Sequence, residues 1–476
     1  MNKVRRCAKT SLIWITLLIS LCACADKTNT DNSTIFSDTT PGEATVTPII
    51  SAEIDDSEYY SNDMNSDHGQ DAVMETETGY YYEADIIYDL SDYKKSFYTG
   101  LNGHRLCYYD KESQKMKLLC NVPKCRHDGG ETCVATYRNI GVISTLLYEN
   151  EIFIYGLERE GTRLELCLWR AGLDGSYIEK VATILEADNP EQEEFKITKA
   201  SPPEFIIHRG SAYIAYYLNV GNSSFGFIGG GIMRVHLGSG ETENVYEMER
   251  NSSPVPMSLN GCGEYVFFYL DAINGGLSCE QRYSLREQTV EDGMYANAYG
   301  YSRLYRILPV DVEKPEKGYV VKCYNVDSEP AGEDFSIDIS VDEYKKYREV
   351  FFYEDKLIII VPYRVLIFGV GDDDYGKKLG EISYDFSAGQ LSYDYKQYNS
   401  FKACNGRIYR IQRPVGGTKP AFGGVEDYTM VDMPVAYSCE IDDVIAGEGE
   451  WVVAYPFLYN ESQKRRVKSL QKMSRV

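Results

Sequence analysis

The 476-residue sequence lacks an apolar run of about 18 residues, the length that a membrane-spanning helix requires, and this excludes a polytopic membrane protein. Basic residues are also few, with 49 Lys and Arg against 72 Asp and Glu, and the formal net charge is −23. Proteins bind nucleic acid mainly through clustered Lys and Arg, so we expect no nucleic-acid partner. Tryptophan is rare, with 3 residues, whereas tyrosine is abundant, with 41.

The common linear motifs of catalysis are missing as well. The sequence has no G-x-S-x-G nucleophile elbow, no phosphate-binding P-loop and no H-E-x-x-H zinc motif. Asp372-Asp373-Asp374 is rich in carboxylates but lacks the alternating ligands and the distal Glu of an EF-type calcium loop, so a solvated turn is the simpler interpretation. Enzymatic activity is therefore uncertain, and the absence of these motifs favours a protein that is not an enzyme.

Residues 1–23 have the pattern of a secretory signal peptide. A cluster of cations precedes the apolar stretch Ser11–Leu21, which is too short to cross a bilayer. The cations are Lys3, Arg5, Arg6 and Lys9. We therefore expect export of the chain and removal of residues 1–23 from the mature protein.

The signal segment ends in Leu21-Cys22-Ala23-Cys24, which resembles the lipobox of bacterial lipoproteins. The resemblance implies cleavage after Ala23 and diacylation of Cys24, which would anchor the chain to the extracytoplasmic face of the cell membrane. Cys22 fits less well, because the bulky Leu21 would then occupy a small-residue position. The alternative is ordinary secretion with an unmodified Cys24.

Two segments are predicted to lie outside the folded domain. Residues 24–78 are expected to be the lipidated cysteine and a disordered acidic tether, because residues 25–78 hold 13 acidic residues and a single cation, Lys27. Residues 461–476 form a basic tail that could contact anionic lipid or wall polymer, although a solvated or frayed tail explains the same composition.

A repeat of short strands runs through residues 79–460, the predicted folded domain. The clearest copies are Leu168–Gly175 (LWRAGLDG), Ile232–Gly238 (IMRVHLG) and Leu304–Asp311 (LYRILPVD), and looser copies begin at Leu106, Leu366 and Ala436. Each copy combines a strand, a Gly- or Asp-rich turn and a return strand, and most follow an earlier apolar strand. Six such units predict an all-β fold, a β-propeller with six blades of four antiparallel strands. Five or seven blades, or two separate β-domains, are the alternatives.

The predicted units are longer than a compact blade of about 40–45 residues. We assign the excess to loop insertions at Asp271–Tyr301, Val326–Arg348 and Pro414–Asp432. In the second insertion, residues 340–343 resemble a capping box, which predicts a short helix. The strand-Arg-x3-Asp-Gly-Ser pattern at Leu168–Ser176 resembles the blades of TolB-like propellers and of related Gram-positive lipoproteins, and this resemblance implies a fold rather than a function.

The most distinctive motif is a cysteine cluster formed by Cys120, Cys125, His127 and Cys133. With Pro123 it resembles the Cys-x-x-Pro-x-Cys-x-His segment and following Cys of uncharacterised propeller-like lipoproteins from Gram-positive anaerobes. Three thiolates and an imidazole make a complete tetrahedral set, so a bound zinc ion would be structural. The spacing is not that of a standard zinc finger, and a disulfide or buried reduced thiols are the alternatives.

Tyrosines and three arginines offer further candidate sites. We interpret most tyrosines as strand residues, but a run that includes Tyr295, Tyr299 and Tyr301 lies in a predicted insertion loop and is the best ligand-binding candidate. Equivalent repeat positions carry Arg170, Arg234 and Arg306. These arginines could line one face, although pairing with carboxylates of neighbouring blades is the simpler account.

Together these features predict a membrane-anchored extracytoplasmic lipoprotein. Its propeller would serve as a binding, sensing or scaffold module for a glycan, a wall polymer or a protein partner. The first alternative is an extracellular hydrolase or lyase that acts on polysaccharide or wall material, since a propeller enzyme needs no linear motif. The second alternative is the solute-binding component of a transporter, which would require helices between the strands.

Overall fold

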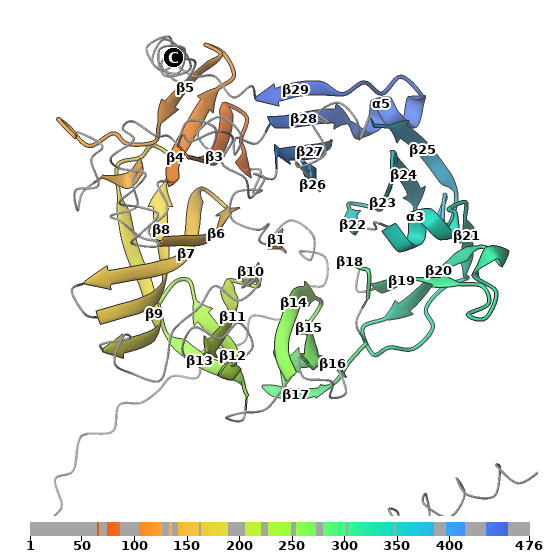
Figure 1. Ribbon diagram of the computed structural model, residues 1–476, viewed down its shortest axis with the longest axis horizontal. Helices are drawn as coiled ribbons and strands as arrows, with labels where there is room; N and C mark the ends of the chain where they lie inside the picture. The colour runs from red at the N-terminus through yellow and green to blue at the C-terminus, as the bar shows by residue number, and fades with distance from the viewer. Residues whose placement is uncertain are drawn as a thin grey trace, which may run out of the picture. The chain divides into compact units, whose positions relative to one another are not determined.

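The computed structural model places seven β-sheets in sequence order within the second of two compact units, Ile54–Val476 (Figure 1). It describes residues 64–65, 74–85, 104–125, 133–135, 141–160, 163–188, 205–219, 227–248, 254–272, 279–294, 296–300, 303–346, 349–384, 397–414 and 435–455. Each sheet, here called a blade, contains four consecutive strands that pair antiparallel with their neighbours.

The four consecutive strands of each blade follow one another in order, and the sheet of blade 3 also contains a fifth strand from an earlier segment. Blades 1 and 2 contain β2 (Met74–Glu75), β3 (Gly79–Asp85), β4 (His104–Asp110) and β5 (Lys115–Leu118), then β6 (Gly141–Tyr148), β7 (Glu151–Glu160), β8 (Arg163–Gly172) and β9 (Ile178–Asp188). Blades 3 and 4 contain β10 (Phe205–His208), β11 (Ser211–Asn219), β12 (Phe227–His236) and β13 (Thr242–Glu247), then β14 (Pro254–Cys262), β15 (Tyr265–Ala272), β16 (Cys279–Ser284) and β17 (Thr289–Asp292).

The last three blades have the same order. They contain β18 (Ala298–Gly300), β19 (Arg303–Pro309), β20 (Tyr319–Asn325) and β21 (Phe335–Ile337), then β22 (Glu349–Tyr353), β23 (Lys356–Val361), β24 (Arg364–Gly369) and β25 (Lys378–Ser383), then β26 (Gln397–Cys404), β27 (Arg407–Pro414), β28 (Val435–Glu440) and β29 (Val452–Tyr455). The blades form a ring with the first strand of each blade innermost, and β14, β18, β22 and β26 contact one another in turn (Figure 1). The fold is therefore an all-β propeller of seven four-stranded blades.

The predicted fold class is confirmed, but the predicted number of six blades is wrong. The repeat aligns Leu304 with Leu168 and Ile232, which lie in third strands, whereas Leu304 lies in β19, the second strand of blade 5. The proposed insertion Asp271–Tyr301 is not a loop, because it contains β16, β17 and β18. The stretch between Ile232 and Leu366 therefore holds two complete blades where the repeat predicts one.

The second proposed insertion, Val326–Arg348, contains β21 and the short helix α3 (Val341–Lys346). The predicted capping box is present, because the Ser340 hydroxyl accepts from the Glu343 backbone N–H at 3.2 Å and the Glu343 carboxylate accepts from the Ser340 N–H at 2.7 Å. The third proposed insertion lies outside the described residues after Pro414. Among the described residues, no helix has the length and apolar content needed to span a membrane.

A two-residue turn joins the first and second strands of five blades. The first turn residue has a positive φ of 49–61° in each case. These residues are Glu149, Arg209, Gly263, Glu354 and Asn405. Tight hairpins favour turns with positive φ because their twist matches that of the paired strands, and Asn405-Gly406 has the residue pair that adopts such turns best. The same inner hairpin thus recurs around the ring.

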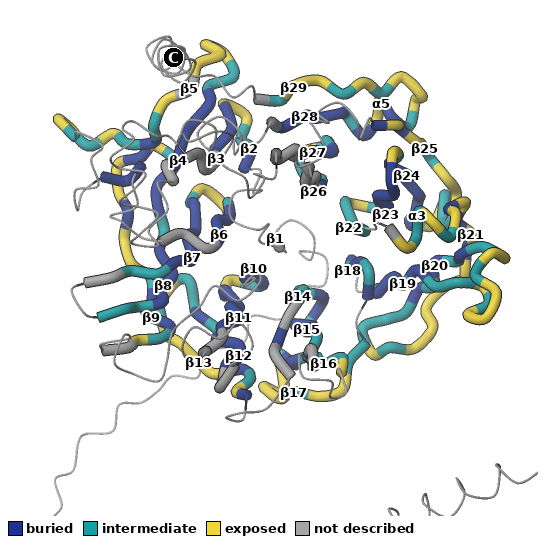
Figure 2. Tube along the Cα trace, in the orientation of Figure 1, coloured by how far each residue is buried: buried dark blue, intermediate teal, exposed yellow. Residues whose placement is uncertain are grey.

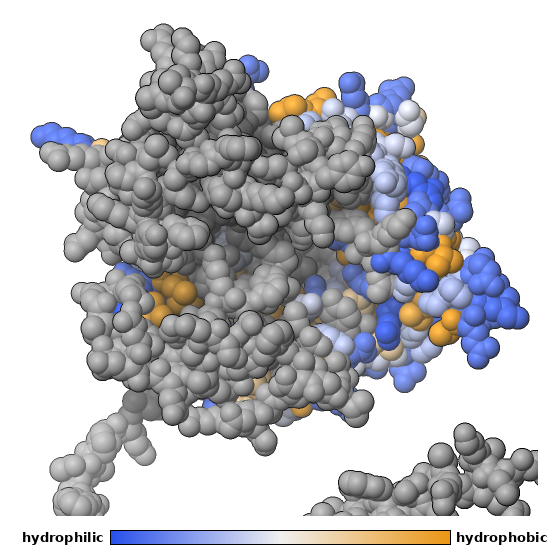
Figure 3. Space-filling model, in the orientation of Figure 1, coloured by the Kyte–Doolittle hydropathy of each residue, from blue (hydrophilic) through white to orange (hydrophobic). Residues whose placement is uncertain are grey.

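Seven apolar clusters fill the contacts between successive blades, one at each junction. Figure 2 shows the buried residues along these contacts, and the fourth strands β13, β17 and β25 each contain at most one buried residue. Six of the nine largest fully buried side chains are tyrosines; they lie in strands, as expected, but in the core rather than on half-exposed faces. In Figure 3 the outer rim of blades 5 and 6 is largely hydrophilic, as expected for a surface that faces water.

Part of the predicted tether belongs to the propeller. The inner strand of blade 1, β2, precedes the predicted domain boundary at residue 79. A further short strand, β1 (Met64–Asn65), pairs antiparallel with β10, the inner strand of blade 3. The expectation of disorder across residues 24–78 is therefore wrong for these two segments, which gain backbone partners that composition does not reveal.

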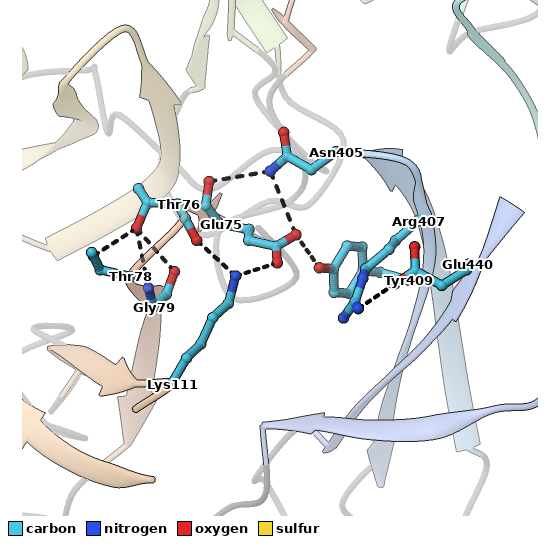
Figure 4. Close-up of polar contacts among 9 residues, drawn as sticks. All are labelled: Glu75, Thr76, Thr78, Gly79, Lys111, Asn405, Arg407, Tyr409 and Glu440. Atoms are coloured by element: carbon cyan, nitrogen blue, oxygen red, sulfur yellow. Dashed lines mark hydrogen bonds and ion pairs between the residues drawn. The ribbon is translucent and has the colours of Figure 1, made fainter. Parts of the chain in front are cut away.

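Side chains close the ring between blades 7 and 1, because each described sheet except that of blade 3 uses only its own consecutive strands. The Glu75 carboxylate accepts hydrogen bonds from the Tyr409 hydroxyl and from Asn405 Nδ2, and it pairs with Lys111 Nζ at 2.6 Å (Figure 4). The Glu75 side chain is only 5% exposed. Burial and the hydrogen bond to Glu75 raise the pKa of Tyr409, which keeps its hydroxyl protonated as a donor.

We predict that Glu75→Gln destabilises the propeller. The substitution keeps the shape of the side chain but removes the charge that Lys111 and the Tyr409 hydroxyl stabilise, so we expect the free energy of unfolding to fall by about 1–3 kcal/mol. Urea unfolding of the purified protein measures this change. The control is Glu77→Gln, since Glu77 is exposed; an equal loss in both variants would contradict a ring-closing role for Glu75.

Candidate functional site

Cys120, Cys125 and Cys133 come together in the segment after β5. Their Sγ atoms all lie within 4.8 Å of one another. Cys133 is buried, with 1% of its surface exposed, whereas Cys120 and Cys125 are half-buried. His127, the fourth predicted ligand, lies outside the described residues. The structure thus brings together the three predicted sulfur ligands.

A tight turn brings Cys125 back towards Cys120. The Cys125 backbone N–H donates to the Val122 carbonyl at 3.2 Å, and Lys124 has a positive φ of 61°. Proline at the second position and a positive φ at the third are features of a type II turn, and Pro123 and Lys124 hold these positions. The Cys-x-x-Pro-x-Cys spacing therefore has a structural reason, since proline presets the turn that pairs the two thiols.

Blade 2 holds the other side of this loop. The Asn121 N–H donates to the Gly175 carbonyl at 2.8 Å. Gly175 has a φ of 71°, and a Cβ atom at this position would lie 2.8 Å from the Cys120 nitrogen, so only glycine fits. Leu119 and Val134, which flank the cysteines, are buried in the cluster between blades 1 and 2. The Asp-Gly turn of the repeat thus supports the cysteine loop directly.

The local polar groups favour the thiolate form of Cys120. Burial opposes ionisation, but the backbone N–H groups of Val122 and Val134 donate to its sulfur, and the thiols of Cys125 and Cys133 add further hydrogen bonds. Together these donors lower the pKa of Cys120 below that of an ordinary thiol. Two sulfurs bound to one tetrahedral zinc ion lie about 3.8 Å apart, which is within the 4.8 Å limit that holds for these three sulfurs, so they could ligate zinc or another soft ion.

A second group, Glu158, Glu165 and Cys167, also places possible metal ligands within 4.8 Å of one another. Lys180 Nζ already pairs with Glu158 at 2.8 Å and with Glu165 at 2.5 Å. Burial raises the pKa of Cys167 to about 12, so this thiol stays neutral. We interpret this group as an ion-pair network centred on lysine rather than as a metal site.

The structure describes only one of the three tyrosines that were predicted to bind a ligand. Tyr299 lies in β18, where its ring packs against Phe267 of blade 4 with centroids 5.3 Å apart and its hydroxyl accepts from the Ala296 N–H at 2.8 Å. It therefore helps to hold the junction between blades 4 and 5. Tyr295 and Tyr301 lie outside the described residues, and their proposed ligand-binding role stays a prediction.

The expected pairing with a neighbouring blade is confirmed for Arg306, whereas Arg170 and Arg234 pair across strands of their own blade. Arg170 and Arg234 lie in third strands opposite Glu179 and Glu243 of the fourth strand of the same blade, and they pair with them at 2.5 and 3.4 Å. In blade 4 the equivalent pair is Arg282 and Glu291, at 3.2 Å. Arg306 lies instead in a second strand and pairs across the junction with Glu280 at 3.6 Å.

Arg282 also links two blades. Its Nη1 donates to the Val326 carbonyl and lies 3.5 Å from Asp327, and its guanidinium lies 4.3 Å from the centre of the Tyr265 ring. Sequence reasoning missed this residue because the repeat alignment passed over blade 4. It missed Glu75 and Tyr409 because their contact joins positions 334 residues apart.

No family model and no curated protein matches the sequence. Among solved structures, the chain is similar to a prolyl endopeptidase at 12% identity and a TM-score of 0.41, over 85% of this chain and 52% of that one. It is also similar to the β-propeller domain of the Trilobed protease from Pyrococcus furiosus at 11% identity and a TM-score of 0.40, over 84% of this chain and 99% of that one.

A third similar structure is an acylaminoacyl peptidase from Pyrococcus horikoshii, at 13% identity and a TM-score of 0.41, over 83% of this chain and 54% of that one. The chain therefore spans about half the length of the two peptidases that it matches.

We predict that the cysteine cluster binds about one zinc ion per chain and that Cys120→Ser removes it, because a hydroxyl is a poor ligand for zinc. Elemental analysis of the purified protein gives the metal content, and Cys279→Ser is the control, since Cys279 is exposed. Chelation should lower Tm in the parent protein and not in Cys120→Ser. A metal-free protein with a mass loss of about 2 Da per disulfide would contradict the metal site.

The lowered pKa of Cys120 has its own consequence in metal-free, reduced protein. More of this thiol is ionised at neutral pH, so iodoacetamide should alkylate it faster than Cys279. As the pH is lowered, the alkylation rate of Cys120 should reach half its maximum at a lower pH than the rate of Cys279 does. Peptide mapping across a pH series measures both rates. Equal pH profiles for the two cysteines would show that the backbone donors do not stabilise the thiolate.

We predict that Arg282→Ala destabilises the propeller more than Arg170→Ala. The Arg282 side chain is 11% exposed and has partners in two blades, whereas Arg170 is 34% exposed and pairs within one blade. We expect the free energy of unfolding to fall by about 2–3 kcal/mol in Arg282→Ala and by at most about 1 kcal/mol in Arg170→Ala. Chemical unfolding of both variants measures the difference, and similar losses would rule out a special role for Arg282 at the junction.

Proposed function

We propose that this chain is an extracytoplasmic lipoprotein, held at the cell membrane by a diacylated Cys24, whose propeller is a binding or scaffold module. The lipobox-like Leu21-Cys22-Ala23-Cys24 supports the anchor. The seven-bladed ring supports the module, because seven apolar junctions make a rigid frame that can position loops for binding. The all-β fold also argues against the solute-binding alternative, which alternates strands with helices.

Five described carboxyl groups have shifted pKa values, and none of them suits a general acid. Each described carboxyl with a shifted pKa is shifted downward; these are Asp110, Glu165, Asp174, Asp311 and Glu343. In Glu165 the hydrogen bond from Lys180 lowers the pKa, and in Glu343 bonds from Arg364 and Ser340 outweigh burial. A general acid needs a raised pKa, so these groups serve as ionised structural partners.

A metal ion at Cys120, Cys125 and Cys133 would belong to the frame rather than to a catalytic centre. Three sulfur ligands with His127 would complete a tetrahedral set and leave no position for a reacting water. Cys120 and Cys133 lie at the two ends of the segment whose flanking Leu119 and Val134 fill the junction between blades 1 and 2. The ion would hold this segment in place.

We predict that Cys24→Ser moves the protein from the membrane fraction to the soluble or secreted fraction, because no acyl chain can then be attached. Expression in a bacterium that processes lipoproteins, followed by fractionation and labelling with a palmitate analogue, measures this. Cys22→Ser is the matched control and should stay labelled and membrane-bound. Labelling that survives in Cys24→Ser would reject the assigned anchor.

A binding role and a catalytic role give different results with the same compounds. A thermal-shift screen against glycans, wall polymers and peptides should raise Tm for a ligand that the propeller binds. The same compounds are then incubated with the protein and analysed by mass spectrometry. Turnover of a polysaccharide or wall fragment would favour the hydrolase or lyase alternative and would overturn the binding proposal.

A further inference from the structure

Blade 3 differs from the other described sheets because it has a fifth strand. The short strand β1 pairs antiparallel with β10 along the inner edge of the blade, with Met64 opposite Ile207 and Asn65 opposite Ile206. This strand comes from the acidic segment that precedes the propeller. The chain thus supplies an extended segment of its own to one inner edge.

The added strand lies at the centre of the ring (Figure 1). It contacts not only β10 but also β6 and β14, the inner strands of blades 2 and 4. An extended segment at this place therefore touches three successive blades. Such a position is unlike a contact on the outer rim, where a segment would meet one fourth strand.

The strand β10 is held in place by side chains that are buried at two blade junctions. Phe205 and Ile207 are buried in the cluster between blades 2 and 3, and Ile206 is buried in the cluster between blades 3 and 4. His208 is also buried, and its Nε2 lies 3.0 Å from the Gly263 carbonyl of blade 4. Because both junctions bury its side chains, β10 contacts an added strand through its backbone edge.

The neighbouring inner strand offers a poorer edge. Pro254 and Pro256 lie in β14, and proline has no N–H to donate to an added strand. The strand β10 contains no proline and presents regular backbone groups to β1. The prolines therefore disfavour strand addition at β14, whereas nothing in the sequence of β10 does so.

We propose that the inner edge of β10 is a strand-accepting site for an extended peptide of a partner protein, and that Met64–Asn65 is its resident occupant. Strand addition recognises an extended backbone through main-chain hydrogen bonds. The resident pairing spans only two residues, so a longer peptide can form more bonds and replace it. This inference rests on the binding role proposed above and names its partner class.

A proline variant of the resident strand tests the site. Met64→Pro combined with Asn65→Pro removes the N–H groups of β1, whereas Met64→Ala combined with Asn65→Ala keeps them. The probe is a fluorescent peptide with the sequence of residues 60–69, added to the detergent-solubilised full chain. A tethered segment competes at an effective concentration of about millimolar, so the probe should bind the proline variant at least ~10-fold more tightly than the parent or the alanine variant.

A probe peptide with proline at the two central positions should not bind, because the recognition is through the backbone. Hydrogen exchange of Phe205–His208 provides the second readout. In antiparallel sheets successive residues face opposite neighbours, so one of the two paired amides should lose protection in the proline variant and regain it with the probe. Equal probe binding by all three proteins, or unchanged protection of β10, would overturn the proposal.

The membrane fraction of each variant is measured in parallel. A chain that stays anchored through Cys24 but binds no peptide defeats this inference alone. A chain that binds the peptide but is not membrane-bound defeats the proposed anchor and leaves the strand-accepting site in place.

Discussion

Ring closure is the constraint on which the rest of this propeller depends. The sheets of blades 7 and 1 share no strand among the described residues, so side chains must hold the two ends of the ring together. Among the residues that the structure describes, the apolar cluster at this junction has five buried members, against fifteen between blades 2 and 3. Glu75 adds a buried carboxylate with donors from both blades. This contact lies beside Tyr80, Tyr109 and Tyr409, which blades 1 and 7 bury against each other away from water.

Polar contacts accompany the two junctions that have the smallest described apolar clusters. Glu75 links blades 7 and 1, and Arg282 links blades 4 and 5, where the cluster also has five buried residues. Blade 1 is held by polar groups towards both neighbours, because the cysteine loop is bonded to Gly175 of blade 2. A metal ion at Cys120 would therefore stiffen the same blade that closes the ring, and the two effects on stability should be coupled rather than additive.

The strands could be predicted because their signals are local: alternating apolar residues, two-residue turns and the capping box at Ser340. The number of blades could not, because Leu304 has the sequence of a third strand and the hydrogen-bonding partners of a second strand. The pairs Arg170–Glu179 and Arg282–Glu291 have the same spacing and lie directly opposite each other, so this spacing marks third and fourth strands better than the apolar pattern does.

The three cysteines were predictable as a group because one tight turn and one short segment connect them, whereas Glu75 acquires its role from Tyr409, at the far end of the folded chain.

The resident strand breaks the symmetry of the repeat through backbone chemistry. A propeller repeats one inner edge around its centre, and its blades differ there in whether backbone N–H groups are available to donate to an added strand. Prolines remove donors from β14, whereas β10 keeps them and is fixed by two apolar clusters. An occupant of β10 touches three blades, so its affinity depends on how those blades are packed. By linkage, an occupant that prefers the closed ring must stabilise closure by the same free energy that closure adds to its binding. For such an occupant, the contact between Glu75 and Tyr409 and the strand at the centre of the ring would be parts of one equilibrium, although they lie at different junctions.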